Sequence, residues 1–515
     1  LALGHGAHAW RAAVAGANAE TLAAGLHDIA AGQIPPDGAR GKPRVAVPRI
    51  AFMFTGQGSQ WAGMGKDLYE EDPVFRAAVE RCASVVTPLI GCSLTDLMFG
   101  DAQQGVSLSD TRLAQPALFT LAYALAERLS SWGIVPDVMI GHSLGEWVAA
   151  CRAGVFTLDD ALRLVVERGR LMAGASQDGA MAAVFASAQC LAELPGELAA
   201  SVDLAAVNAP DECVISGPSG AVNQVCEALE SQGVGTQLLR TSHAFHSRLM
   251  EPALDAFASA VSGAALARPA LDLVSNLTGT TDAPFDTVDY WVRHIRQPVR
   301  FAEGVATLAR MNIDVLIEIG ASPNLIGTAS RCPAFQVAAP VLAATLRRNQ
   351  AAGRTLGGLL AQLHVAGVPL RWDALYGQAV RIDIPGYPFA RQRHWAEQTG
   401  AQAVRHQGLA LQSFDVQAAP DTSGAAPVSV QDPATEVSQF LARALQLPQA
   451  DCDSDRGFLE MGVDSLALTE AVAALERKWS ISIPRRALFE TLGTPARLIA
   501  HVLAESAKAP SPVAP

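Results

Sequence analysis

Residues 140–146 (Ile-Gly-His-Ser-Leu-Gly-Glu) are the clearest candidate for chemistry in this chain. An apolar run precedes them, and a helix-like segment begins at Trp147. A Gly-x-Ser-x-Gly sequence between a strand and a helix predicts a sharp turn that exposes the Ser143 hydroxyl as a nucleophile. The N-terminus of the following helix offers backbone N–H groups to a developing oxyanion. An ordinary turn is the alternative for such a short motif, so the rest of the chain must decide.

A serine nucleophile needs a base, and a histidine far away in sequence is the usual one. Residues 243–246 (His-Ala-Phe-His) offer two histidines in a connecting segment. His246 is the better candidate, because the chain there is expected to rejoin the large subdomain. A histidine with a purely structural role is the alternative.

Arg168 is the third candidate, on a helix-like segment that follows residues 157–160. A guanidinium held in a cleft pairs bidentately with a carboxylate, more directionally than a lysine does. Glu167 and Arg170 stand beside it, so a salt-bridged helix surface in solvent is the alternative reading.

The elements that must position these residues predict an α/β core. Residues 49–54 form an apolar strand that runs into the glycine-rich loop 55–60. This loop lacks the Lys-Ser/Thr of a phosphate-binding loop, but its free N–H groups suit an oxyanion hole. A helix over 115–129 and strands ending at 140, 274 and 319 continue the alternation of helix and parallel strand.

Residues from about 178 to 241 have a different order of elements. Strands are expected at 181–186, 204–208, 213–216 and 237–240, with helices at 190–199, interrupted at Pro195, and at 221–231. The order β-α-β-β-α-β is that of a ferredoxin-like unit. It predicts a small subdomain inserted into the large one.

The C-terminal part predicts a second compact unit. Residues 399–430 are rich in Ala, Gln, Pro, Ser and Thr without periodicity, which indicates a linker. Helices are expected at 436–447, from Ser465 onward, at 485–490 and at 495–504. Together they predict a small helical bundle.

Composition excludes several classes of protein. The net charge of −12 argues against a nucleic-acid partner, which would require a basic surface. No apolar run reaches the ~18 residues that a membrane span needs, and the first residues do not form a signal peptide. The eight cysteines form no Cys-x-x-Cys pair, so neither a metal site nor a disulfide framework is expected. This use of cysteine predicts a cytoplasmic location. Without an initiator Met, the sequence is expected to be part of a longer chain.

These segments together resemble the acyltransferase domain of a modular type I polyketide synthase. The resemblance covers about residues 1–398, and residues 462–466 (Gly-Val-Asp-Ser-Leu) are similar to the modification site of an acyl carrier protein. It rests on ordered blocks at 54–60, 115–118, 141–146, 167–172, 207–210, 243–246, 275–279, 291–301 and 387–395.

The resemblance implies a catalytic role for five residues. Ser143 would be the nucleophile and His246 the base of a Ser–His dyad. A backbone carbonyl near His294, within residues 293–299, would orient the base. The backbone N–H groups of Gln57 and Leu144 would form the oxyanion hole.

The resemblance also implies that the acyl group is malonyl, supplied as malonyl-CoA. Arg168 would bind its free carboxylate. His243 and Phe245 belong to a His-Ala-Phe-His block that malonyl-selecting members carry, and Leu144 also fits such members. Phe245 would fill the space that an α-methyl needs, and one methyl is worth ~1–3 kcal/mol of discrimination.

The resemblance implies cofactor and partners as well. Ser465 would carry 4′-phosphopantetheine, installed by a phosphopantetheinyl transferase, and its thiol would accept the malonyl group. The other partners would be the acyl carrier protein and ketosynthase domains of the same synthase.

The expected fold class is α/β. It comprises an α/β-hydrolase-like large subdomain, the inserted ferredoxin-like subdomain and a C-terminal four-helix carrier-protein bundle. The expected domains are a partial ketosynthase–acyltransferase linker (1–45), the acyltransferase (46–370, with the insert at about 178–241), a post-acyltransferase segment (371–398), a flexible linker (399–430) and the acyl carrier protein (431–508).

Two other functions stay open at this point. A serine esterase or thioesterase of the α/β-hydrolase type would share the Ser143 turn, but it would need an acidic triad member and no Arg168. A non-catalytic scaffold, in which only the carrier works, is the other alternative.

Overall fold

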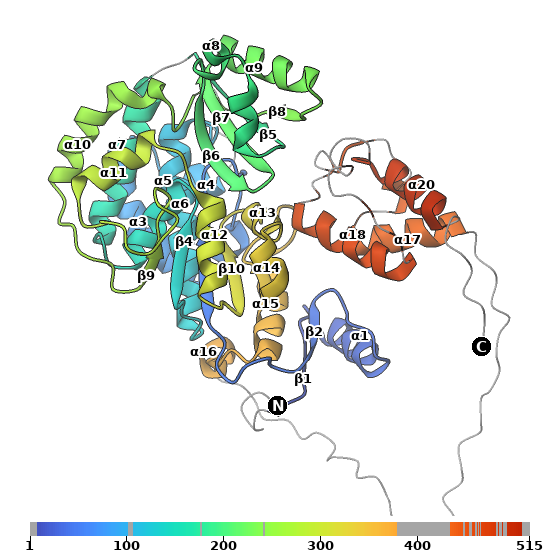
Figure 1. Cartoon of the computed structure of the whole chain (residues 1–515). Helices are drawn as coiled ribbons and strands as arrows, with labels where there is room; N and C mark the ends of the chain where they lie inside the picture. The colour runs from blue at the N-terminus through green and yellow to red at the C-terminus, as the bar shows by residue number, and fades with distance from the viewer. Residues whose placement is uncertain are drawn as a thin grey trace, which may run out of the picture.

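The computed structural model describes residues 8–100, 107–175, 178–239, 241, 243–377 and, with short gaps, 433–506. The block at 387–395 and the predicted linker at 399–430 lie outside these residues. The described chain contains an α/β unit with an inserted sheet, an N-terminal strand pair and a C-terminal helical unit (Figure 1).

The large subdomain is built on a five-stranded parallel sheet. Its strands are β3 (Ile50–Phe54), β4 (Val138–Gly141), β9 (Asp272–Val274), β10 (Val315–Ile319) and β11 (Val341–Ala344). They lie in the order β11-β10-β3-β4-β9. Alternate residues of β3 enter two different cores, with Phe52 and Phe54 in one and Ala51 and Met53 in the other. Burial on both faces explains why this strand is an unbroken apolar run.

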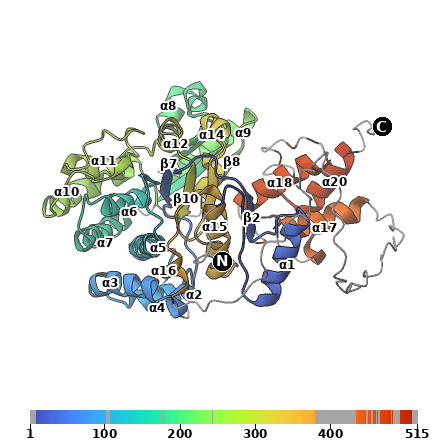
Figure 2. The ribbon, with the colours of Figure 1, turned by 90° about the horizontal axis from the view of Figure 1, so that it is seen from below.

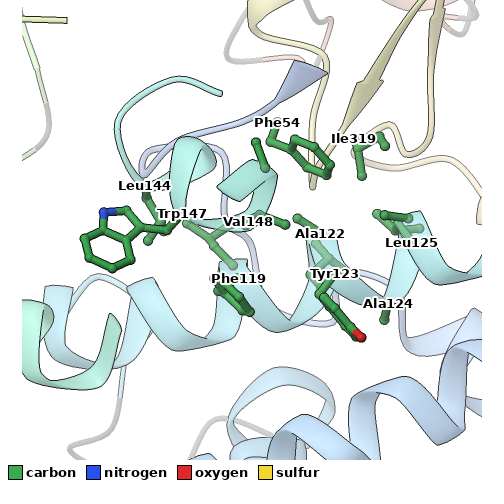
Figure 3. Packing of buried hydrophobic residues seen from close by; sticks show 14 of the residues in the cluster. Phe54, Phe119, Ala122, Tyr123, Ala124, Leu125, Leu144, Trp147, Val148 and Ile319 are labelled. Atoms are coloured by element: carbon green, nitrogen blue, oxygen red, sulfur yellow. The ribbon is translucent and has the colours of Figure 1, made fainter. Parts of the chain in front are cut away.

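Helices cover both faces of this sheet (Figure 2). Figure 3 shows part of the first core, where residues of the strands pack with side chains of the helices around Phe119 and Trp147. The helix predicted at 115–129 is confirmed, but it begins earlier, at Thr111, because Asp110 caps it. The helices are α2 (Lys66–Glu71), α3 (Pro73–Ile90), α4 (Leu94–Phe99), α5 (Thr111–Ser131), α6 (Leu144–Arg152), α7 (Leu158–Ala175), η2 (Arg248–Ala253), α10 (Leu254–Ser262), α11 (Val288–Arg296), α12 (Phe301–Arg310), α13 (Leu325–Ala329), α14 (Pro333–Ala338), α15 (Ala352–Ala366) and α16 (Trp372–Tyr376).

The inserted subdomain is a four-stranded antiparallel sheet with helices on it. Its elements are β5 (Gly179–Val184), η1 (Ala188–Glu193), α8 (Gly196–Ala199), β6 (Asp203–Ala209), β7 (Glu212–Pro218), α9 (Ser219–Ser231) and β8 (Thr236–Leu238). The strands lie in the order β6-β7-β5-β8, so the predicted ferredoxin-like arrangement is present. The predicted interruption at Pro195 is also present, since Pro195 separates η1 from α8.

An N-terminal strand pair packs beside the large subdomain. It consists of β1 (Arg11–Val14), α1 (Ala19–Ala30) and β2 (Gly38–Gly41), with β1 and β2 antiparallel. The Arg11 guanidinium donates to the carbonyl of His364 in α15 at 2.9 Å, which ties this unit to the end of the α/β unit.

The C-terminal unit has a core of its own. Its described elements are α17 (Pro433–Leu445), η3 (Gln449–Asp451), α18 (Ser465–Trp479) and α20 (Pro495–Ser506). They pack around Leu441, Val472 and Leu498. The helix predicted at 485–490 falls almost entirely outside the described residues. In the part of the chain that is described, no helix is long and apolar enough to cross a membrane.

Candidate active site

The predicted sharp turn joins β4 to α6 and presents Ser143. Ser143 has φ 49° and ψ −111°, a conformation that residues with a side chain rarely adopt. Two glycines make the turn possible. A Cβ on Gly141 would lie 2.0 Å from the Glu146 nitrogen, and one on Gly145 would lie 2.1 Å from the Phe54 oxygen. The glycines therefore permit a close approach of backbone to backbone at both sides of Ser143.

Ser143 and His246 meet as the sequence predicts. The distance from Ser143 Oγ to His246 Nε2 is 2.8 Å. His246 Nδ1 lies 2.9 Å from the Gln297 carbonyl oxygen. A proton on Nδ1 is donated to this carbonyl, which leaves Nε2 free to accept the serine proton.

The carbonyl that orients His246 is that of Gln297, which lies near His294 within the expected residues 293–299, and His294 itself does not supply it. Gln297 directly follows the last residue of α11 and has an extended backbone, so its carbonyl is not used inside the helix. The His294 side chain is buried, and its Nε2 lies 3.7 Å from Glu146 Oε2.

Burial keeps His246 neutral. It lowers the pKa of His246 well below its ordinary value, and the nearby charges of His294, Arg168 and His142 lower it further. A neutral imidazole is the form that accepts a proton, so the base is ready at physiological pH.

Arg168 is buried at the same place rather than exposed on the surface of α7. Only 2% of it is exposed, whereas Glu167 and Arg170 pair with each other in solvent. Its Nη2 lies 3.3 Å from Ser143 Oγ, and its Nη1 donates to Gln115 Oε1 at 2.6 Å.

No acidic side chain within the described residues pairs with Arg168, and its Nε has no hydrogen-bond partner there. Burial lowers the pKa of Arg168 to about 9. A cation buried without a counter-ion is costly unless a ligand neutralises it. Arg168 is therefore a candidate for binding an anion near the serine hydroxyl.

Gln57 and Leu144 follow neighbouring strand ends. Phe54 at the end of β3 pairs with Gly141 at the end of β4, so the loop with Gln57 and the turn with Leu144 lie at the same edge of the sheet. In the described chain neither backbone N–H has an acceptor. The Gln57 side chain accepts from Thr111 Oγ1 at 2.9 Å.

His243 and Phe245 lie in the segment that carries His246. Their rings are stacked, with centroids 5.7 Å apart and 6° between the planes. Phe245 packs half-buried between the two cores of the large subdomain. Both residues are therefore adjacent to the dyad in the chain and held in a fixed orientation.

Sequence reasoning missed three residues of this site. Gln115 holds Arg168, the Gln297 carbonyl holds His246, and Asn276 Oδ1 accepts the Ser143 backbone N–H at 2.7 Å. Gln115 and Asn276 stand in two blocks that carried the resemblance, and this was the available signal.

Ser465 is the first residue of α18. Asp464 before it lies outside the described residues. A serine at the N-terminus of a fifteen-residue helix fits a phosphate ester, because the free N–H groups and the helix dipole favour an anion there. Among the side chains that are described, no cluster of three or more His, Cys, Asp or Glu could hold a metal ion.

Comparisons with known proteins agree with this geometry. The family described as "Acyl transferase domain" matches residues 51–369, and the family described as "Phosphopantetheine attachment site" matches residues 435–502. The acyltransferase domain from the second module of the salinomycin polyketide synthase is a solved structure with 38% identity and a TM-score of 0.65, covering 72% of this chain and 86% of its own.

Two further proteins extend the comparison. Polyketide synthase GfsA of Streptomyces halstedii is 36% identical over 93% of this chain. This chain spans only 6% of the length of GfsA. The malonyl CoA-acyl carrier protein transacylase of Coxiella burnetii is 26% identical with a TM-score of 0.55, covering 62% of this chain and 99% of its own.

Proposed function

Since this chain belongs to the acyl transferase domain family and joins that domain to a phosphopantetheine attachment domain, as modular type I polyketide synthases do, we propose that it transfers malonyl from malonyl-CoA to its carrier. The observation that carries the proposal is Arg168, a buried cation that pairs with no acidic side chain among the described residues and whose Nη2 lies 3.3 Å from Ser143 Oγ. A malonyl thioester has one free carboxylate, and this group would pair with the Arg168 guanidinium.

In the first half of the reaction Ser143 Oγ attacks the thioester carbonyl. His246 Nε2 takes the hydroxyl proton, and the backbone N–H groups of Gln57 and Leu144 stabilise the oxyanion. The carbon–sulfur bond breaks, coenzyme A leaves with the proton from His246, and malonyl remains as an ester on Ser143.

In the second half the ester is resolved by a thiol. Phosphopantetheine on Ser465 supplies that thiol. His246 accepts the thiol proton and returns it to Ser143 Oγ as the ester bond breaks. Arg168 holds the malonyl carboxylate throughout, which orients the ester carbonyl and restricts water.

Selection of malonyl over methylmalonyl is assigned to the stacked pair His243 and Phe245. The Phe245 ring is half-buried and stacked on His243, and it would occupy the space that an α-methyl group needs. Leu144 directly after the nucleophile is the second residue that fits a malonyl-selecting site.

The domain organisation proposed from the sequence accompanies this function. It comprises a partial ketosynthase–acyltransferase linker (1–45) and an acyltransferase (46–370) with an α/β-hydrolase-like large subdomain and an insert at about 178–241. A post-acyltransferase segment (371–398), a flexible linker (399–430) and a four-helix carrier (431–508) follow. A ketosynthase and a phosphopantetheinyl transferase would be its further partners.

The esterase alternative receives less support. An α/β-hydrolase triad places an acid behind the histidine, whereas His246 Nδ1 faces the Gln297 carbonyl. A carboxylate-binding cation also has no task in hydrolysis of uncharged esters.

Intact-mass spectrometry after mixing with malonyl-CoA tests the proposal. We expect one malonyl group on Ser143, and none in Ser143→Ala. A competition among malonyl-, methylmalonyl- and acetyl-CoA should give mainly the malonyl product. Hydrolysis without a detectable acyl-enzyme would favour the esterase, and no acylation at all would favour the scaffold.

A further inference from the structure

Ser143 occupies the N-cap position of α6 but does not cap the helix with its side chain. A serine at this position normally uses its hydroxyl to accept a backbone N–H of the first turn. Here the hydroxyl bonds His246 and Arg168 instead. The backbone of Ser143 is also in a strained conformation, which persists only where the surroundings impose it. A group outside the turn must therefore hold it.

Asn276, in the loop after β9, contacts the turn on both sides of the nucleophile. Its Oδ1 accepts the Ser143 backbone N–H at 2.7 Å, and its Nδ2 donates to the Gly141 carbonyl at 2.6 Å. Only one orientation of the amide satisfies both bonds, because one group is a donor and the other an acceptor. The side chain is 2% exposed, so water does not compete for these bonds.

The Asn276 backbone is fixed by α6 itself. Its N–H donates to Glu146 Oε2 at 2.7 Å, and the Tyr290 hydroxyl donates to Glu146 Oε1. Glu146 is the third helical residue, where a capping-box glutamate would reach back to the N-cap N–H. Here Asn276 lies between the two residues: Glu146 accepts the Asn276 backbone N–H, and Asn276 Oδ1 accepts the Ser143 backbone N–H.

We infer that Asn276 is a positioning residue that holds the nucleophile turn in its strained conformation and thereby leaves the Ser143 hydroxyl free for chemistry. The inference rests on the proposed role of Ser143 as the nucleophile. Without the Asn276 amide, the Ser143 N–H and the Gly141 carbonyl lose their partners inside the protein. The turn then relaxes, which moves Ser143 Oγ away from His246 Nε2 and the Leu144 N–H away from the oxyanion.

Single-turnover acylation of the full chain by malonyl-CoA tests this inference in Asn276→Ala. We expect the acylation rate to fall about 100-fold, comparable to loss of one oxyanion donor, with KM for malonyl-CoA within about threefold of wild type. The final amount of malonyl bound per chain should remain near that of wild type, because every molecule is folded and reacts slowly.

The matched control is Thr278→Ala. Thr278 is exposed in the same loop, and among the described residues its hydroxyl bonds only the Thr280 hydroxyl and the Thr280 backbone N–H. It should react at the wild-type rate. A purely structural role of Asn276 would reduce the final amount of malonyl bound and leave the rate of the remaining fraction unchanged, and this result would overturn the inference.

A fluorophosphonate probe separates this inference from the proposed function. Ser143 Oγ forms a bond to phosphorus, fluoride leaves, and His246 takes the proton, so the reaction needs no carboxylate. Suppose that neither the wild type nor Asn276→Ala takes malonyl, and that the probe labels Asn276→Ala more slowly than the wild type. This result would support the inference and contradict the proposed function. Wild-type rates of Asn276→Ala with both reagents would sink the inference alone.

Discussion

At the scale of single residues, Arg168 is a buried cation that we assign to the substrate carboxylate. Burial lowers the pKa of Arg168 to about 9, which means that the charged guanidinium is less stable inside the folded protein than in water. We expect Arg168→Ala to lose preference for malonyl-CoA and to gain acetyl transfer. The measurement is the ratio of acetyl- to malonyl-enzyme in a competition mixture. An unchanged ratio would contradict the assignment of Arg168 to the substrate carboxylate.

Arg168→Met separates the cost of the charge from the loss of volume. Replacing a buried charged group with an apolar one of similar size is expected to raise the free energy of unfolding by about 1–2 kcal/mol, part of the gain being offset by the unpaired Gln115 oxygen. Chemical denaturation of both proteins at neutral pH measures this difference. A destabilised Arg168→Met would mean that the guanidinium stabilises the empty site.

Phe245 is expected to limit the size of the acyl group. In Phe245→Ser the space beside His246 opens, and methylmalonyl-CoA should gain about 10-fold or more relative to malonyl-CoA. The ratio of the two kcat/KM values measures the effect. No gain in methylmalonyl transfer would count against the steric argument and leave selectivity with other residues.

The lowered pKa of His246 predicts the pH dependence of acylation. A base whose pKa lies well below its ordinary value stays neutral as the pH falls through about 6.5, where a free imidazole takes a proton. The single-turnover rate should therefore stay constant between about pH 6 and 8 and fall only in more acidic solution. A midpoint near 6.5 would contradict this expectation. The same shift lowers the stability of the fold below about pH 6.5, because the unfolded chain then binds the proton more readily.

At the level of elements, the turn between β4 and α6 depends on close contact among the backbones of β3, β4 and α6. The Cβ of Gly145→Ala would lie 2.1 Å from the Phe54 oxygen, so α6 must move away from β3. We expect a loss of about 1–3 kcal/mol in the free energy of unfolding together with slow acylation. Thermal unfolding and acylation rates measure both effects.

Gly174→Ala is the control for this substitution. Gly174 lies near the end of α7, and its added Cβ would meet no atom within 4 Å. We expect it to stabilise the protein by about 0.5 kcal/mol, because alanine loses less conformational freedom than glycine in a helix. Equal effects of the two changes would mean that the contact with Phe54 does not determine the turn.

Elements with a strong local pattern could be predicted from the sequence, and elements without one could not. The strand at residues 50–54 is an apolar run bounded by a glycine-rich loop, and it was predicted to within one residue. β1 and β2 were missed, since Arg11–Val14 and Gly38–Gly41 are short and rich in Ala, Gly and Arg. They pair only because the fold brings them together.

The candidate site follows the same rule. Ser143, His246 and Arg168 were found because their side chains carry the chemistry and stand in recognisable blocks. The orienting carbonyl was placed within residues 293–299 but could not be assigned to Gln297, because every residue has a carbonyl and only the end of α11 leaves this one free. The bond from Asn276 to Ser143 spans 133 residues, and no local pattern reports it.

At the level of the whole molecule, the proposed transfer of malonyl takes place between the α/β unit and the C-terminal unit, which have separate hydrophobic cores. The core of the C-terminal unit contains residues of 437–502 alone. We therefore expect Ser465→Ala to take one malonyl group on Ser143 at the wild-type rate, and the phosphopantetheinylated wild type to take two. Intact-mass spectrometry counts the groups. Slow acylation of Ser143 in Ser465→Ala would indicate that the two units are coupled.

Arg168, which pairs with no acidic side chain among the described residues, affects which form of the protein is the more stable one. With the proposed clamp, a malonyl group on Ser143 neutralises a charge that the empty protein must otherwise bury alone. The loaded form is then the more heat-resistant form, and in the presence of malonyl-CoA it is also the resting form. The protein therefore rests as the malonyl-enzyme, and the arrival of the carrier, rather than of malonyl-CoA, limits the rate of transfer.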